Sequence, residues 1–115
     1  MKTLQALAKA QCNPITPDTK GLVIPTIESY LSLMPGWEAP LNYKSIEKTF
    51  SFKNYLQTVH FVNAVTWVAQ QQDHHPRICF DYNQCHVTLT TNALKGLSQN
   101  DFILAAKIES LLAEV

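Results

Sequence analysis

The sequence contains neither a cluster of basic residues nor a long apolar segment. Nine Lys and Arg residues balance nine Asp and Glu residues, so the formal net charge is +0 at pH 7. A protein with this balance and no basic run lacks the electrostatic footprint of a strong binder of nucleic-acid phosphates. No apolar stretch approaches the ~20 residues that span a bilayer, and the N-terminus lacks the apolar core of a signal peptide. These absences predict a cytoplasmic protein whose partners include neither a nucleic acid nor a membrane.

The cysteines are few and are not spaced as metal ligands. Cys12, Cys79 and Cys85 are odd in number and form no Cys-x-x-Cys pair. This pattern argues against both a disulfide framework and a cysteine-rich zinc site. We therefore expect three reduced, partly buried thiols.

The length and composition suit one small domain preceded by an arm. The chain has 115 residues, of which 46% are hydrophobic and 16% are charged, and a chain of this size can bury a modest core. Residues 12–18 form a turn-rich connector that contains Pro14 and Pro17. We expect residues 1–21 to form an N-terminal arm packed on the body, and residues 22–115 to form a single domain.

Hydrophobic periodicity within the domain predicts the order helix, two strands, helix, two strands, helix. The expected helices cover residues 25–34, 53–72 and 98–113, and the expected strands cover residues 37–41, 43–52, 77–82 and 86–91. Hairpin connections favour antiparallel pairing, so the sequence predicts an α+β fold: a four-stranded antiparallel sheet with helices packed on one face. Free strand edges and broadly apolar helices also predict a homo-oligomer.

One charged side chain falls on the apolar face of the second expected strand. Ile46, Phe50 and Phe52 share this face, and Lys48 lies between them. A lysine in such a place can lay its stem along apolar neighbours while its amine remains hydrated. We expect the amine of Lys48 to reach water.

Two adjacent histidines, His74 and His75, follow the long expected helix. Pro76 disfavours helical dihedral angles at His75, so the helix should end at or before the pair. Imidazole suits proton transfer because its unperturbed pKa of ~6.5 lies near working pH. A His-His-Pro segment by itself is more typical of a surface turn, and a zinc site is disfavoured because no third ligand is well placed. Asp101 either assists the start of the last helix or belongs to a site.

Several segments around this pair form an ordered pattern: His74-His75-Pro76, Tyr82, Leu89-Thr90-Thr91, Gly96-Leu97-Ser98, residues 100–108, Pro35-Gly36-Trp37 and residues 50–53. Together they resemble a known family, the pterin-4a-carbinolamine dehydratases, over about residues 22–112. The resemblance implies dehydration of a 4a-hydroxytetrahydropterin to the quinonoid dihydropterin and water, in support of tetrahydropterin recycling. It also implies that the reaction uses no metal or organic cofactor and that the protein forms a homodimer or homotetramer.

The resemblance assigns roles to five residues and shows two departures. His74 and His75 match the catalytic pair, and Asp101 matches a site aspartate. Gln70 stands where the family has an acidic residue, and Asn92 stands where it has a third histidine. Both replacements can hydrogen-bond a pterin but cannot titrate, and we expect Gln70 to orient His74 across one helical turn.

The two departures leave three functional hypotheses. Loss of one acid or base group typically costs ~10²- to 10⁴-fold in rate, which predicts a slow dehydratase. The alternatives are a noncatalytic pterin-binding or regulatory protein and a protein-interaction module. The last follows from the resemblance alone, because a vertebrate relative stabilises dimers of a homeodomain transcription factor.

Overall fold

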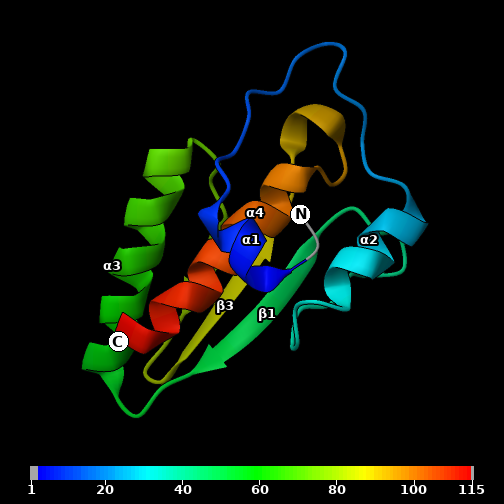
Figure 1. Cartoon of the computed structure of the whole chain (residues 1–115). Helices are drawn as coiled ribbons and strands as arrows, with labels where there is room; N and C mark the ends of the chain where they lie inside the picture. The colour runs from blue at the N-terminus through cyan, green and yellow to red at the C-terminus, as the bar shows by residue number, and fades with distance from the viewer. Residues whose placement is uncertain (1–2, 115) are drawn as a thin grey trace.

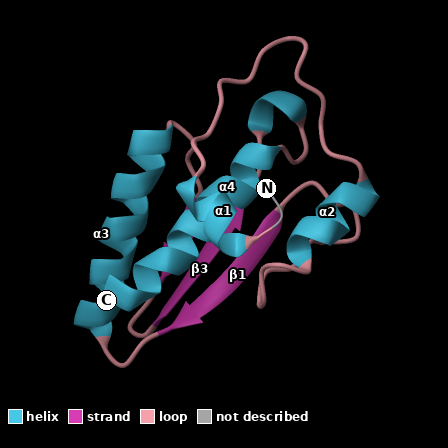
Figure 2. Cartoon of the chain, in the orientation of Figure 1, coloured by secondary structure: helices cyan, strands magenta, loops and turns pink. Residues whose placement is uncertain are grey.

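The computed structural model describes residues 3–114 as helices arranged over a small antiparallel sheet (Figures 1 and 2). It has an α+β architecture, as predicted. The elements in chain order are α1 (Leu4–Lys9), α2 (Ile24–Leu31), β1 (Ile46–Ser51), α3 (Tyr55–Gln72), β2 (Arg77–Phe80), β3 (Gln84–Leu89), the 3₁₀ helix η1 (Asn92–Leu94), α4 (Gln99–Ser110) and the 3₁₀ helix η2 (Leu111–Glu114).

The sheet has three strands, so the prediction of a four-stranded sheet was wrong. The strand order is β1-β3-β2, and both pairings are antiparallel. β3 is the central strand: Phe50 of β1 and Phe80 of β2 both lie opposite Cys85. β2 therefore forms one edge of the sheet.

The missing strand is the one expected at residues 37–41. In this segment Glu38 forms one isolated bridge with Glu47, and the chain then turns, with the amide of Tyr43 donating to the carbonyl of Pro40. Pro40 cannot donate to a strand ladder, and Tyr43 has a φ of 53°, which lies outside the extended region. Residues 37–41 have an alternating apolar pattern that is typical of a strand. Trp37 is buried in the core, but the segment does not pair as a strand.

α3 and α4 lie on one face of the sheet, as expected, and α1 lies over α4 (Figure 1). The core between the helices and the sheet is rich in aromatic rings: Phe50 and Phe61 meet edge to face with centroids 4.8 Å apart. Tyr30 of α2 stacks on Phe102 of α4 at 4.7 Å. In α4, residues 100–106 and Ile108 are all buried, which is why that helix organises the fold.

The N-terminal segment packs on the body rather than projecting from it. Leu7 of α1 is fully buried, and the ammonium of Lys107 in α4 donates to the carbonyl of Ala8 at 2.8 Å. The division into an arm of residues 1–21 and a domain of residues 22–115 stays a prediction. The cysteines are free, as expected, although Cys79 is exposed on β2 rather than partly buried. Within residues 3–114, no helix has both the length and the hydropathy needed to cross a bilayer.

The amine of Lys48 is paired with a carboxylate, and its contact with water stays a prediction. Lys48 forms an ion pair with Glu109 of α4 and donates to the carbonyl of Pro35 at 3.1 Å. The two side chains are only 20% and 14% exposed, and the same carboxylate accepts the indole N–H of Trp37 at 2.9 Å. The pair connects β1 to α4. Gly36 lies beside the pair with a φ of 90°, a conformation that favours glycine, and a Cβ there would also lie 2.8 Å from the flexible end of the Lys48 side chain, at Cε.

Replacing both Lys48 and Glu109 should destabilise the fold by less than the sum of the two single replacements. In Glu109→Leu, the ammonium of Lys48 and the indole of Trp37 both lose their acceptor, and we expect a loss of about 2–4 kcal/mol in the free energy of unfolding. In Lys48→Met/Glu109→Leu no charge is left unpaired, so the loss should be smaller than the sum of the two single losses. Urea unfolding followed by circular dichroism measures the loss in Glu109→Leu, in Lys48→Met and in the double variant. Simple additivity of the two single losses would contradict the coupling.

Candidate active site

The long helix α3 ends immediately before the two histidines, as the sequence predicted. Asp73 adopts the left-handed conformation with a φ of 51°, and the amide of His74 donates to the carbonyl of Ala69 at 3.2 Å while that of Asp73 donates to the carbonyl of Gln70. These two bonds are a Schellman motif, which satisfies the last carbonyls of the helix. The motif reverses the chain direction, so His74 and His75 leave the helix toward β2.

His74 makes a hydrogen bond with the carboxylate of Asp101. Its Nε2 lies 2.6 Å from Oδ1 of Asp101, and the two side chains are 11% and 0% exposed. An ionised carboxylate only accepts hydrogen bonds, so Nε2 of His74 carries the proton. Nδ1 is therefore the nitrogen through which His74 can exchange a proton with a ligand.

Asp101 is held by two further donors from the loop before α4. Its Oδ2 accepts the hydroxyl of Thr91 at 2.7 Å and the backbone amide of Ser98 at 2.9 Å. Ser98 and Asp101 form a capping box at the start of α4, and the hydroxyls of Thr91 and Ser98 also bond each other at 2.7 Å. Asp101 thus assists the start of α4 and also contacts His74, and its role in a site stays a prediction.

His75 is exposed and is paired with Gln70. Its Nε2 lies 3.0 Å from Oε1 of Gln70, so the expectation that Gln70 orients His74 was wrong. The reason is the Schellman motif, which turns His74 toward α4 and leaves His75 over the last turn of α3. The two imidazoles therefore have different partners, a buried carboxylate for His74 and an exposed neutral amide for His75.

Asn92 lies next to this network in the chain but is exposed. It is the first residue of η1 and directly follows Thr91, whose hydroxyl donates to Asp101. The structure therefore brings together His74 with Asp101, and His75 with Gln70, whereas Asn92 is adjacent only to Thr91, which bonds Asp101. Thr91 was not singled out from the sequence as a site residue, since a threonine at the end of a strand carries no signal of a buried carboxylate partner.

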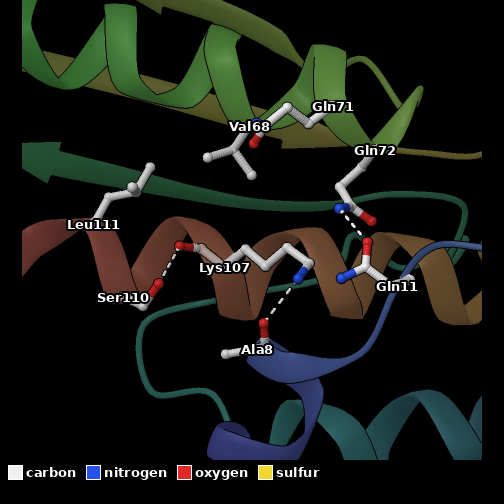
Figure 3. Close-up of a pocket in the computed structure, with 8 residues that line it drawn as sticks. All are labelled: Ala8, Gln11, Val68, Gln71, Gln72, Lys107, Ser110 and Leu111. Atoms are coloured by element: carbon white, nitrogen blue, oxygen red, sulfur yellow. Dashed lines mark hydrogen bonds between the residues drawn. The ribbon is translucent and has the colours of Figure 1, made fainter.

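Two hollows lie elsewhere on the surface. The larger, of about 450 Å³, is formed by α1, α3, α4 and the segment after α1, and is lined by Ala8, Gln11, Val68, Gln71, Gln72, Lys107, Ser110 and Leu111 (Figure 3). The smaller, of about 260 Å³, lies on strand residues that include Thr49, Cys79 and His86. No cluster of three His, Cys, Asp or Glu side chains suited to a metal ion is found among residues 3–114.

Comparisons with known proteins agree with the resemblance seen in the sequence. The family model described as pterin 4 alpha carbinolamine dehydratase matches residues 21–111. A protein of Hydrogenovibrio crunogenus named "Putative pterin-4-alpha-carbinolamine dehydratase" is 62% identical over 112 residues, which cover 97% of this chain and 99% of that protein.

Two solved structures share the fold. A protein from Brucella melitensis described as a transcriptional coactivator/pterin dehydratase superposes with a TM-score of 0.77 and 26% identity, over 80% of this chain and 98% of that chain. A pterin dehydratase-like protein described as a RuBisCO assembly factor in the alpha-carboxysome superposes with a TM-score of 0.58 and 25% identity, over 66% of this chain and 88% of that chain. The chain belongs to the pterin 4 alpha carbinolamine dehydratase family.

Proposed function

We propose that this protein dehydrates a 4a-hydroxytetrahydropterin to the quinonoid dihydropterin in the cytoplasm. The observation that carries the proposal is the arrangement of its two adjacent histidines. A fully buried carboxylate, Asp101, fixes His74 through Nε2, and His75 lies beside it with its ring exposed. This gives two neighbouring imidazoles with distinct environments, as a reaction that needs both an acid and a base requires.

His74 is the base of this reaction and His75 is the acid. Nδ1 of His74 takes the proton from the pterin ring nitrogen next to C4a, and Asp101 stabilises the positive charge that develops on the imidazole. His75 gives a proton to the 4a-hydroxyl, the C–O bond breaks and water leaves. The electron pair of the broken N–H bond forms the new C=N bond. Solvent then returns each histidine to its starting form, so no cofactor is consumed.

The two departures from the family fall on the exposed part of the site. Gln70 gives His75 a neutral partner where a carboxylate would stabilise the imidazolium, and Asn92 can contact the pterin but cannot transfer a proton. Asp101 is fully buried and keeps the base in place, so it acts through His74, while Gln70 and Asn92 are the exposed groups that contact the substrate. The proposed enzyme is therefore slower than a family member with all acid and base groups.

Substituting each histidine separately should separate chemistry from stability. His74→Ala and His75→Ala should each lower the rate of 4a-carbinolamine dehydration by ~10²- to 10⁴-fold or to the spontaneous rate. His74→Ala should also destabilise the fold by about 1–3 kcal/mol, because Asp101 loses a buried donor. His75→Ala should change stability by less than about 0.5 kcal/mol, because the ring is exposed. The assay uses freshly generated carbinolamine, with His60→Ala on the exposed face of α3 as the control. If the wild type dehydrates the carbinolamine no faster than the spontaneous rate, the proposed enzymatic function is refuted.

Restoring the missing histidine should accelerate the reaction. Asn92→His places an imidazole at an exposed position beside Thr91, where it can be accommodated without repacking. We expect a gain of at least ~10-fold in kcat, which is a fraction of what one acid or base group usually contributes. Asn63→His, an exposed asparagine on α3, is the matched control. Equal rates for Asn92→His and wild type would show that residue 92 does not limit the chemistry.

The protein is also proposed to form a homodimer or homotetramer. β2 is an edge strand, and Phe80, 45% exposed, clusters there with the exposed rings of Tyr55 and Tyr82 at centroid distances of 6.3–6.4 Å from Tyr55. An edge strand flanked by exposed aromatic rings can pair with a second copy of the same strand.

Adding a charge at this edge should separate the copies. Phe80→Lys should lower the sedimentation coefficient to that of a monomer, because pairing of two β2 strands would bring two like charges into one interface. The far-ultraviolet circular dichroism should stay unchanged. Val23→Lys, at an exposed apolar position before α2, should leave the assembly intact. A wild-type protein that sediments as a monomer would contradict the proposal.

A noncatalytic role is the second candidate, and a specific observation favours it. Both family positions that this chain has replaced with neutral residues, Gln70 and Asn92, are exposed, while the outer face of α3 presents Leu56 and Trp67, the latter 66% exposed. One structural neighbour is described as an assembly factor. The dehydration assay separates the two candidates: a binding or assembly protein would leave the carbinolamine to decay at its spontaneous rate.

A further inference from the structure

The segment that follows α1 crosses the place where the two halves of the buried pair meet. His74 lies just beyond the C-terminal end of α3, and Asp101 lies in the first turn of α4. Figure 1 shows the chain after α1 passing beside the top of α3 and the start of α4. The family match begins at residue 21, so this segment lies outside the matched residues.

Residues 12 and 13 of this segment are bonded to both helix ends. The amide of Cys12 donates to Oε1 of Gln72 at 2.8 Å, and Nε2 of Gln72 donates in turn to Oε1 of Gln11 at 2.8 Å (Figure 3). Oδ1 of Asn100 accepts the amide of Asn13 at 2.9 Å, and Nδ2 of Asn100 donates to the carbonyl of Asn13 at 2.7 Å. The side chain of Asn100 is almost wholly buried and thus pairs with the backbone of residue 13 as a strand neighbour would.

These bonds form a second connection between α3 and α4, beside the bond from His74 to Asp101. Gln72 is two residues before His74, and Asn100 is one residue before Asp101. The bond from His74 to Asp101 and the path from Gln72 through Cys12 and Asn13 to Asn100 therefore span the same gap between α3 and α4. A strap across that gap limits how far the two helix ends can separate.

We propose that residues 11–13 are a positioning strap, with Gln72 and Asn100 as its positioning residues, that holds His74 on Asp101. The expected effect on kcat rests on the proposed function, whereas the expected effect on the bond between His74 and Asp101 does not. The strap touches neither histidine, so it acts on the geometry of the base and not on substrate binding. Geometric errors of about 1 Å at a reacting group can cost ~10²-fold in rate, which is why a second constraint here matters.

The strap is tested by removing its side-chain bonds without changing side-chain size. Gln72→Met and Asn100→Leu delete the bonds and keep the shapes of the side chains, and Gln72→Glu keeps the acceptor oxygen for Cys12. Thr19→Val is the control, because Thr19 bonds only Thr16 in the exposed turn farther along the segment. Gln72→Met removes bonds from a half-buried position, so it can be measured even if Asn100→Leu fails to fold.

Two readouts keep the strap separate from the proposed enzyme activity. The first is the Nε2–H resonance of His74 in ¹⁵N-labelled protein, which should be present in the wild type and weakened or lost in Gln72→Met and Asn100→Leu. The second is kcat, which should fall by about 10- to 100-fold with KM changed less than about 2-fold. Gln72→Glu should recover most of both signals, and Thr19→Val should match the wild type. Hydrogen exchange at the backbone amides of Cys12 and Asn13, which are the donors of the strap, reports release of the segment.

Two results would overturn the strap. One is continued protection of the Cys12 and Asn13 amides from hydrogen exchange in Gln72→Met/Asn100→Leu, since the bonds to Gln72 and Asn100 would then not be what holds the segment. The other is a released segment with the His74 resonance and kcat unchanged. If the wild type has no turnover but its His74 resonance still depends on Gln72 and Asn100, the proposed function fails and the strap stands.

Discussion

The buried carboxylate of Asp101 is the constraint on which the rest of the site depends. A carboxylate with no access to water is strongly disfavoured unless several donors surround it, and here those donors come from three parts of the chain: the hydroxyl of Thr91, the amide of Ser98 and the imidazole of His74. Satisfying one charge therefore fixes the end of β3, the start of α4 and the residue after α3. The same interactions that make α4 begin at residue 99 also deliver His74 to its place.

This coupling explains how a small sheet can support a defined site. The strands give α3 and α4 a common face to pack on, and the aromatic core around Phe50 and Phe61 sets their distance from the sheet. The core does not by itself fix how the helix ends approach each other, because those ends lie at the boundary of the buried region. Polar contacts do so instead: the Schellman turn at Asp73, the capping box at Ser98 and the bonds of residues 11–13.

Local patterns predicted most of the fold, and contacts distant in sequence account for what they missed. The helices, the β2–β3 hairpin and the capping signal at Ser98 follow from periodicity and turn chemistry within about ten residues. The prediction of a fourth strand was wrong because the apolar Trp37 was read as part of an alternating strand pattern. Its indole instead donates to Glu109, which is 72 residues away. The partner of Gln70 was wrong for a similar reason: one left-handed residue, Asp73, decides which histidine faces α3, and helical spacing cannot show it.

Burial also decides which residues of the site carry information about chemistry. His74 and Asp101 are needed by the fold, because replacing either leaves a buried group of the other without its partner, so their presence alone does not require catalysis. Gln70 and Asn92 are exposed, and a change there costs the fold little. His75 is exposed too, and its contact with Gln70 is a surface hydrogen bond that other polar side chains could make. An imidazole at that position contributes little to stability, and what distinguishes it from other polar residues is proton transfer. Among the five residues proposed for the site, His75 is therefore the one whose identity points to chemistry rather than to structure.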